Sequence, residues 1–389
     1  MRILICATEA PLPPLNGMRL QLRELVRGLA ARHEVCVLAF RWPEQTGAAP
    51  DGVELIELPP PRAGTVPRLA GWARALARRE PVEAKLAGAM AARIEELRAA
   101  REFDVAHVTI GALAGVAPAL EGLPAVIAPL DAWHLNVHAQ VQRASGARRA
   151  ALGVQERLVR RFTATRYRPF ARAVFVTDAD ARAARELDPS LRTIVIGNGV
   201  DTERFSPDGG APEPGRILFT GALHAPSNEA AAVLLADAIL PAVRERVPAA
   251  HLCLAGRAPG PAVRELAARP GIEVAADVPD LTPWLRSAEV FACAMTSGTG
   301  IKNKLLEALA TATPSEATPL ACQGLAVRDG EQLVIAEPDG RFADAVAALL
   351  ADPERRRALG AAGRAYVEAH HGWSAVVAAY ERLYAEVAA

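Results

Sequence analysis

Short apolar runs alternate with longer amphipathic segments along the whole chain. In the first half, the apolar runs predict strands at Ile3–Ala7, Glu34–Ala39, Val53–Leu58, Val105–Thr109, Ala125–Ala128 and Ala173–Thr177. The segments between them carry a helical period and predict helices at Gly17–Ala31, Glu83–Arg101 and Gln140–Arg172.

The same alternation restarts in the second half. Its predicted strands are Thr193–Ile196, Ile217–Thr220, Leu252–Ala255, Ile272–Ala275, Val290–Ala294 and Leu333–Ala336. Its predicted helices are Glu229–Val247, Pro261–Ala268, Thr282–Ala288, Lys302–Ala312, Phe342–Ala351 and Glu354–Ala369. Strands that alternate with helices indicate parallel sheets covered by helices on both faces.

The repeated pattern and the length of 389 residues favour two doubly wound α/β domains. Glycines at 197–201 and the Pro-Asp-Gly-Gly stretch at 207–210 interrupt the pattern between them. We expect an N-terminal domain over 1–195, a C-terminal domain over 196–372 and a last helix over 373–389. For that helix, packing back on the N-terminal domain is an option that the sequence leaves open. Two such domains facing each other would form a cleft at the carboxyl ends of their strands.

The composition narrows the class of protein. The chain is 51% hydrophobic and 23% charged, which is typical of a globular protein, and its 44 basic residues balance its 44 acidic ones. Zero net charge and only 5% aromatic residues argue against a protein that binds nucleic acid by charge or by base stacking.

The cysteines and the apolar runs indicate the cellular compartment in which we expect the protein. Five cysteines without a Cys-x-x-Cys pair indicate structural thiols in a reducing compartment. No apolar run approaches the roughly 20 residues of a membrane span, and the chain opens directly into a strand. We therefore expect a cytoplasmic protein.

The most informative motif is the stretch 297–308, Ser-Gly-Thr-Gly-Ile-Lys-Asn-Lys-Leu-Leu-Glu-Ala. Two of the three lysines in the chain, Lys302 and Lys304, lie there, behind a glycine turn and at a helix start. Glycines allow close approach to the backbone, the helix start offers unpaired N–H groups, and lysine adds a positive charge. The stretch therefore predicts an anion site, and the carboxylate of Glu307 can accept the hydroxyls of a ribose. A plain helix start with solvated lysines is the alternative.

Other loops at predicted strand ends could take part in the same site. Gly17 and Gly221 allow a ligand to approach the backbone, with His224 and a predicted helix cap, Asn228, after Gly221. Arg257 could pair with a phosphate, and the backbone of Asp277 and Val278 could bind a base edge. Ordinary turns would explain the last two loops equally.

Titratable groups also follow the strand Ala125–Ala128. Asp131, His134 and His138 lie at its carboxyl end, where histidine can transfer protons and aspartate can orient it or act directly. Asp178 and Asp180 resemble a metal motif, but after Thr177 they are better explained as helix-capping residues. An arginine-rich helical face over 143–172 could touch an anionic surface, although a solvated face explains it more simply.

In this order and spacing, the motifs resemble glycosyltransferase family 4, retaining nucleotide-sugar enzymes with two facing Rossmann-like domains, the GT-B fold. The resemblance covers nearly the full length. It is carried by the proline-rich loop before Gly17, the segment 197–205, the Gly221 turn and, most closely, the Gly-Ile-Lys-Asn-Lys-Leu-Leu-Glu-Ala stretch at 300–308.

The resemblance implies that the C-terminal domain binds a nucleotide-diphosphate sugar, UDP- or dTDP-linked, and that the N-terminal domain binds the acceptor. The expected donor-site residues are Gly17, Gly221, His224, Arg257, Asp277, Val278, Thr299, Gly300, Ile301, Lys302, Lys304, Leu305 and Glu307. The expected catalytic residues are Asp131, His134 and Lys302. Of the donor residues, Gly300, Ile301 and Lys302 would contact phosphate and Glu307 the ribose.

Five residues at three sites depart from the family pattern. Thr299 replaces a glutamate that contacts the donor sugar in many relatives, and Ala222 and Ser227 replace an arginine and a lysine that hold the diphosphate. Ser315 and Glu316 stand where an apolar pair is usual. The base, the donor sugar, the acceptor and the oligomeric state stay open.

The resemblance also implies same-face attack, with the leaving phosphate helping to deprotonate the acceptor hydroxyl, and no metal or cofactor. The acceptor is a small molecule, a glycan or a lipid-linked molecule, and peripheral membrane contact is not favoured. The alternatives on this architecture are a nucleotide-sugar 2-epimerase, a phosphorylase and a non-catalytic nucleotide-sugar-binding relative.

Overall fold

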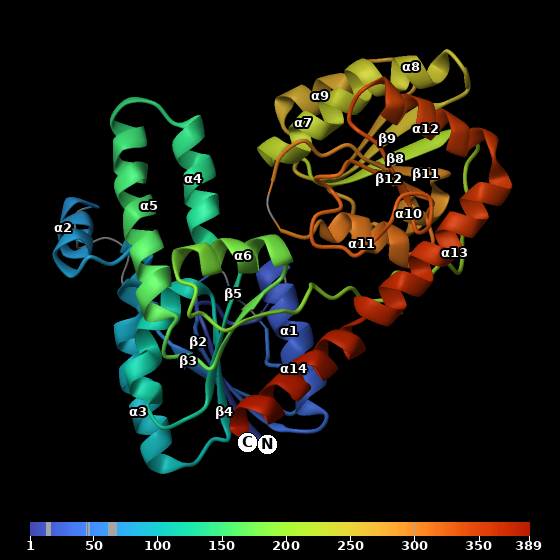
Figure 1. Cartoon of the computed structure of the whole chain (residues 1–389). Helices are drawn as coiled ribbons and strands as arrows, with labels where there is room; N and C mark the ends of the chain where they lie inside the picture. The colour runs from blue at the N-terminus through green and yellow to red at the C-terminus, as the bar shows by residue number, and fades with distance from the viewer. Residues whose placement is uncertain (13–16, 44, 46, 61–67, 299) are drawn as a thin grey trace. The chain divides into compact units, whose positions relative to one another are not determined.

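The computed structural model describes residues 1–12, 17–43, 45, 47–60, 68–298 and 300–389. They form two compact units (Figure 1). The first consists of Met1–Gly197 together with Val376–Ala389, and the second of Asn198–Ala375. Each unit is a parallel sheet flanked by helices, so the α/β class predicted from the alternation is confirmed.

The first unit contains a seven-stranded parallel sheet in the order β3-β2-β1-β4-β5-β6-β7. Its strands are β1 (Arg2–Ala7), β2 (Glu34–Phe40), β3 (Val53–Leu58), β4 (Val105–Thr109), β5 (Ala125–Leu130), β6 (Arg172–Phe175) and β7 (Thr193–Val195). Its helices are α1 (Gly17–Ala30), α2 (Arg68–Arg78), η1 (Val82–Leu86), α3 (Ala87–Ala100), η2 (Gly111–Leu120), α4 (Trp133–Arg143), α5 (Gly146–Arg166) and α6 (Asp178–Leu187).

Alternate side chains of these strands point to two different layers. Leu4, Cys6 and Ala106 pack in one cluster with residues of α3, η2 and α5. On the opposite face, His107 of β4 meets α14 (Trp373–Ala388), where its Nδ1 lies 2.6 Å from the Tyr384 hydroxyl. Helix α14 also packs on α1, because a Cβ added at Gly28 would lie within 2.5 Å of Val377.

Two predictions for this unit need correction. The strand at 193–195, grouped above with the second half, pairs with β6 in the first sheet. The single helix predicted over Gln140–Arg172 is two helices, α4 and α5, followed by the start of β6. Ser145 is extended and Gly146 has a φ of +55°, which breaks the helix, and Pro169 prevents it from continuing into β6.

The second unit contains a six-stranded parallel sheet in the order β10-β9-β8-β11-β12-β13. Its strands are β8 (Arg216–Ala222), β9 (His251–Arg257), β10 (Ile272–Ala276), β11 (Val290–Cys293), β12 (Ser315–Ala317) and β13 (Val334–Ile335). Its helices are α7 (Pro226–Leu234), η3 (Leu235–Ile239), α8 (Leu240–Arg244), α9 (Pro261–Leu266), α10 (Thr282–Ser287), α11 (Asn303–Ala310), α12 (Gly340–Ala351) and α13 (Pro353–His370).

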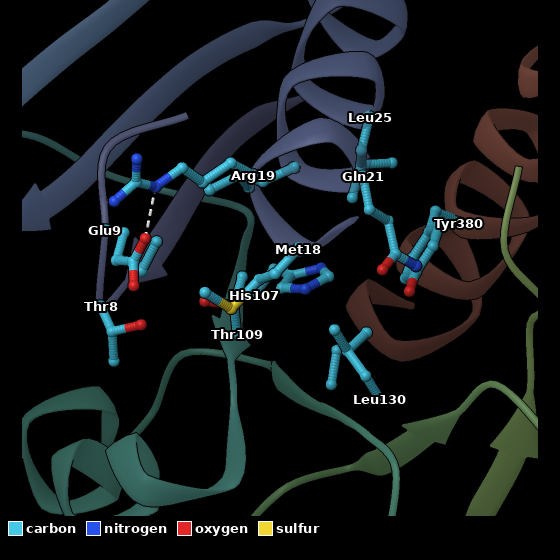
Figure 2. A pocket seen from close by; sticks show the side chains of 13 residues that line it. Thr8, Glu9, Met18, Arg19, Gln21, Leu25, His107, Thr109, Leu130 and Tyr380 are labelled. Carbon is cyan, nitrogen blue, oxygen red and sulfur yellow. Dashed lines mark hydrogen bonds and ion pairs between the residues drawn. The ribbon is translucent and has the colours of Figure 1, made fainter. Parts of the chain in front are cut away.

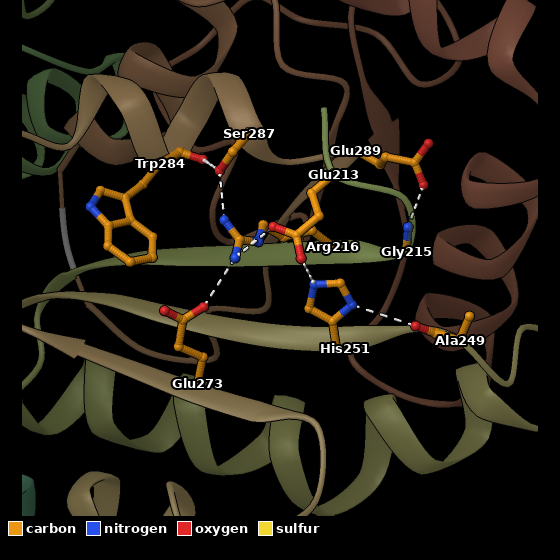
Figure 3. A network of polar contacts seen from close by, with 9 residues as sticks. All are labelled: Glu213, Gly215, Arg216, Ala249, His251, Glu273, Trp284, Ser287 and Glu289. Atoms are coloured by element: carbon orange, nitrogen blue, oxygen red, sulfur yellow. Dashed lines mark hydrogen bonds and ion pairs between the residues drawn. The ribbon is translucent and has the colours of Figure 1, made fainter. Parts of the chain in front are cut away.

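The amino ends of β8 and β9 are fastened by a polar network (Figure 3). The Arg216 guanidinium binds Glu213, Glu273 and the Ser287 hydroxyl, and it lies 5.7 Å from the Trp284 ring centroid. These contacts tie the starts of three neighbouring segments together. The loops of the candidate site lie at the opposite edge of this sheet, where the strands end.

Two further sequence predictions differ in detail. The helix predicted over Glu229–Val247 starts earlier, at Pro226, and contains the π turn η3 before α8. Pro241 has no N–H to donate, and a locally wider turn accommodates it. Asn228 is not the helix cap, because Ala225 takes that position ahead of Pro226.

Both sheets have the Rossmann strand order, in which the third, second and first strands are followed by the fourth, fifth and sixth. The direction of winding reverses between β1 and β4 in the first sheet, and between β8 and β11 in the second. Ligands of such sheets bind outside the carboxyl ends of the strands at this reversal. No described helix combines the length and the apolar content that a membrane span needs.

Candidate functional site

The candidate donor site lies at the reversal point of the second sheet. Gly221 lies near the end of β8 with a φ of +151°, and its partner Gly256 lies near the end of β9 with a φ of +158°. A Cβ at Gly256 would lie 1.9 Å from the Gly221 carbonyl oxygen. The two strand ends therefore approach as closely as only glycines allow.

The loop between β11 and α11 forms a second wall. Gly298 and Gly300 have φ values of +112° and +68°, conformations that favour glycine. Lys302 is only 7% exposed and folds back over this loop. Its Nζ donates to the carbonyl oxygens of Gly300 at 2.7 Å and Gly298 at 3.3 Å.

The amino end of α11 is open in a way that suits an anion. Lys302 is the N-cap residue, and its side chain makes no capping hydrogen bond to the first N–H groups of the helix. Those groups and the helix dipole attract a negative charge. Ile301 and Leu305 are buried, at 8% and 0% exposure, so they anchor this end of the helix in the core.

Lys304 extends from α11 to the end of β8. Its Nζ donates to Asn228 Oδ1 and lies 4.4 Å from the Phe219 ring centroid. A Cβ at Gly221 would lie 2.8 Å from the same Nζ. Burial lowers the pKa of Lys304 to about 8. The sequence left open whether Lys304 points to a pocket or to solvent, and the structure turns it toward the strand end.

Glu307 is the acidic group of this cluster. Burial raises the pKa of its carboxyl to about 7, while the charges of Lys304 and Arg204 pull it partly back. No described residue donates a hydrogen bond to this carboxylate. A half-buried carboxylate that titrates near neutrality beside a cation is typical of a ligand site.

Four other expected donor residues lie at the same edge of the second sheet, in different settings. His224 and Arg257 are exposed, after β8 and at the end of β9. The Asp277 carboxylate is used structurally, since its Oδ1 accepts from the Ala258 N–H at 2.7 Å, and Val278 follows it in the loop. Gly17 begins α1 in the first unit. Thr299 lies outside the described residues, as do Pro13 and Pro14 of the proline-rich loop.

The titratable groups predicted in the first unit differ in burial and in hydrogen bonding. Asp131 follows β5, accepts from Asn136 Nδ2 at 2.7 Å, and has its pKa raised by burial and by Asp180. His134 is only 3% exposed in α4, and burial lowers its pKa. Its Nδ1 finds no hydrogen-bond partner among the described residues. His138 is exposed and pairs with Glu156 at 3.1 Å.

Asp178 and Asp180, which resemble a metal motif, lie in the first turn of α6, and the capping residue is Thr177. Thr177 is the N-cap of α6 and accepts from the Asp180 N–H at 3.0 Å. Asp180 Oδ1 accepts from the Ala132 N–H at 2.9 Å, so this carboxylate joins α6 to the start of α4. The described residues contain no group of three or more His, Cys, Asp or Glu side chains arranged to hold a metal.

Sequence reasoning missed the role of Asn228 and did not single out Thr220. Asn228 bridges the cluster, because its Nδ2 donates to the Ala222 carbonyl at 2.9 Å while its Oδ1 accepts from Lys304. Thr220 on β8 is fully buried, and its hydroxyl has no partner among the described residues. The Pro226 start of the helix was the available signal for Asn228, since it moves Asn228 into the first turn.

Comparisons with known proteins cover both units. The family described as "Glycosyltransferase Family 4" matches residues 15–204, and the family described as "Glycosyl transferases group 1" matches residues 214–352. Phosphatidyl-myo-inositol mannosyltransferase of Mycobacterium tuberculosis is 32% identical over 209 residues, 50% of this chain and 54% of the relative. The Mycobacterium leprae protein is 33% identical over 205 residues, with the same coverage. The chain thus spans about half the length of the curated relatives it matches.

Solved structures resemble the fold over the full length. Sucrose-phosphate synthase of Thermosynechococcus elongatus has a TM-score of 0.71 at 17% identity, covering 100% of this chain and 99% of that one. HepE of Anabaena in complex with UDP has a TM-score of 0.64 at 14% identity, covering 99% and 100%. The fold is GT-B, with two Rossmann-like domains. With the family matches on both halves, the chain belongs to glycosyltransferase family 4.

Proposed function

We propose that this protein is a retaining glycosyltransferase that moves a sugar from a nucleotide-diphosphate sugar to an acceptor hydroxyl without a metal ion. The observation that carries the proposal is the cluster of Lys302, Lys304 and Glu307 around the uncapped start of α11. It lies at the reversal point of a Rossmann-like sheet, in a chain of family 4. A cytoplasmic location and the absence of a resident cofactor are part of the same proposal.

The diphosphate would lie between the glycine loop and the end of β8. As the sugar–phosphate bond breaks, negative charge grows on the leaving diphosphate. Lys302, Lys304 and the N–H groups of α11 would neutralise it. Lys304 lies beside Gly221 and Asn228, close to the two positions where Ala222 and Ser227 replace the basic pair of many relatives. It would supply a charge that those positions lack.

Glu307 would hold the ribose hydroxyls, and Asp131 would orient the acceptor hydroxyl or accept its proton. The pKa of Asp131 is raised by burial, which makes it a better proton acceptor than an exposed aspartate. His134 is the second candidate for orienting the acceptor hydroxyl or accepting its proton. For the base of the donor, the UDP complex of HepE favours uracil. For the sugar, the mycobacterial relatives are mannosyltransferases by name.

Calorimetric titration tests the donor site. We expect UDP to bind the wild type and uridine to bind at least tenfold more weakly, because uridine lacks the diphosphate, and EDTA to leave UDP binding unchanged. Lys302→Ala and Lys304→Ala should each weaken UDP binding about tenfold, the worth of one charged hydrogen bond. The matched control is Lys85→Ala, which removes the remaining lysine, an exposed residue of η1.

If UDP, dTDP, GDP and ADP all fail to bind, or if both site variants bind like Lys85→Ala, the donor site is wrong. Given a binding nucleotide, NMR of the product formed from its sugar conjugate and a set of alcohols tests the reaction. Retained anomeric configuration supports the proposal, and inversion refutes the retaining mechanism. Isomerisation of the donor without acceptor would point to an epimerase.

A further inference from the structure

The ammonium group of Lys304 has neutral partners among the described residues. Its Nζ donates to the amide oxygen of Asn228, lies 3.9 Å from the Met295 sulfur and lies 4.4 Å from the centroid of the Phe219 ring. No described carboxylate forms an ion pair with it, and Glu307 of the same helix attracts it without direct contact. An anion bound at this point would therefore meet a positive charge that no carboxylate of the described chain contacts.

A buried cation of the first unit shows the more usual arrangement. Arg19 of α1 is only 6% exposed, and its guanidinium forms an ion pair with the Glu9 carboxylate (Figure 2). Charges inside proteins are normally paired in this way, because burial disfavours an isolated charge. Lys304 lacks such a pair, and a bound anion would supply it.

The charge of Lys304 lies at the end of β8, where the neighbouring loop provides no lysine or arginine. That loop runs from Gly221 to Asn228 and contains neither residue type. Lys304 comes from α11 instead, and a Cβ added at Gly221 would lie 2.8 Å from its Nζ. Ligands of open α/β sheets bind at such a strand end, beside the reversal point. The cation of this strand end is therefore supplied by a different segment of the chain.

The Asn228 side chain holds this cation in one orientation. Its Nδ2 donates to the Ala222 carbonyl oxygen at 2.9 Å, so its Oδ1 is left to accept from Lys304. The reversed amide would place NH₂ against the ammonium and oxygen against a carbonyl oxygen. Asn228 itself is fixed in the first turn of α7, behind Pro226, where its N–H donates to the Ala225 carbonyl at 2.9 Å. A lysine that is fixed before the ligand arrives loses less entropy on binding.

We propose that Asn228 is a positioning residue for the donor diphosphate. It holds the Lys304 ammonium at the end of β8 and, because it is neutral, leaves the charge of that group for a phosphate oxygen. The amide takes one N–H of the ammonium, and the others can bind the diphosphate. Only the assignment of the anion to a donor diphosphate rests on the proposed function.

Calorimetric titration of the full chain with UDP and with uridine tests the role. Asn228→Ala should weaken UDP binding about fivefold, the worth of one hydrogen bond, through loss of the fixed cation. Uridine binding should not change, because uridine has no diphosphate. Gln142→Ala, which removes an exposed side-chain amide from α4 of the first unit, is the matched control and should bind both ligands like the wild type.

A double-mutant cycle separates positioning from damage to the loop. If Asn228 acts through Lys304, the double variant Asn228→Ala/Lys304→Ala should bind UDP like Lys304→Ala alone. A loop that is distorted by the loss of Asn228 would weaken UDP binding in both backgrounds to the same extent. Equal losses in the two backgrounds would therefore overturn the proposal.

The pH profile of UDP binding adds a readout that a purely structural role would not move. Burial lowers the pKa of Lys304 to about 8, so wild-type affinity should fall as the pH rises through that value. Of the other groups that act on this ammonium, Cys293 stays neutral there, with its pKa raised by burial to about 11, Glu307 has already ionised, and Lys302 is close by. Asn228→Ala removes the acceptor of the charged form, so the fall should begin about one pH unit lower. Lys304→Ala should lack this fall.

Asn228→Asp keeps the test decisive if Asn228→Ala does not fold. It retains an acceptor for Lys304 but adds a negative charge beside the diphosphate, so UDP binding should weaken at least tenfold while uridine binding is unchanged. Wild-type UDP affinity in the Asn228 variants, a matching loss of uridine affinity, or an unmoved alkaline fall overturns the proposal. UDP binding that depends on Lys304 but not on Asn228 refutes only this inference, whereas failure of every nucleoside diphosphate to bind the wild type refutes the proposed function as well.

Discussion

Glu316 is a glutamate in the middle of the second sheet. It lies on β12 between Ala292 of β11 and Val334 of β13, with no exposed surface. Neither carboxylate oxygen has a hydrogen-bond partner among the described residues. Burial raises the pKa of this carboxyl to about 9, and Asp329 adds to the shift. The group is therefore protonated in the folded protein at neutral pH.

Folding then takes up a proton, and the stability depends on pH. The unfolded carboxyl ionises near pH 4.5 and the folded one near pH 9. Stability is fully present below pH 4.5 and is lost as the pH rises toward 9. At pH 7 the loss is about 3 kcal/mol, from 1.36 kcal/mol for each unit above the unfolded pKa. Glu316→Gln cannot ionise, so it should stabilise the second unit by about this amount at pH 7 and by little at pH 4.5.

Calorimetric unfolding of the full chain between pH 5 and 8.5 measures this difference. The transition of the second unit should weaken with pH in the wild type, and its pH slope should be reduced in Glu316→Gln. Glu245→Gln makes the same exchange at an exposed residue and should keep the wild-type slope. Equal slopes in the wild type and Glu316→Gln would refute the reasoning, because they would mean that Glu316 is ionised in the folded state.

Four other outcomes follow from described contacts. The pKa of His107 is about 4 in the folded protein and 6.5 when unfolded. The first unit should therefore lose up to about 3 kcal/mol of stability as the pH falls from 6.5 to 4. Acid unfolding should show less of this loss in His107→Gln. Gly256→Ala should cost about 2–4 kcal/mol in urea unfolding, because its Cβ meets the backbone of Gly221. Gly221→Ala should lower both the stability of the second unit and the UDP affinity, because the φ of +151° favours glycine and the added Cβ meets Lys304 Nζ and the Asn228 amide. UDP affinity should rise through about pH 7 as Glu307 ionises, and Glu307→Gln should flatten this profile in titrations at several pH values.

The sequence predicted the architecture because strand and helix periods are local properties. The runs at Ile3–Ala7 and Val290–Ala294 became central strands of the two sheets, and the glycine–lysine stretch came to lie at a reversal point. What the pattern could not show is which strands pair. The strand at 193–195 was grouped with the wrong sheet, because a short apolar run carries no information about its neighbours.

Side-chain direction was also beyond the sequence. The motif places Lys302 and Lys304 together, yet one folds back on its own loop and the other reaches β8. Asn228 was predicted as a cap but bonds Ala222 and Lys304 instead. Each outcome depends on contacts between segments far apart in the chain. The roles of the predicted site residues in catalysis stay predictions.

Helix α14 also bears on the order in which the chain can fold. From Val376 onward it belongs to the first unit, where Tyr380 and Tyr384 cover His107. During synthesis the first sheet would emerge early, but the part of its face around His107 stays uncovered until residues 376–389 leave the ribosome, after the whole second unit. Domains usually fold in the order of their synthesis. Here the second unit can complete its core first, and the last turns of the chain then close the first one.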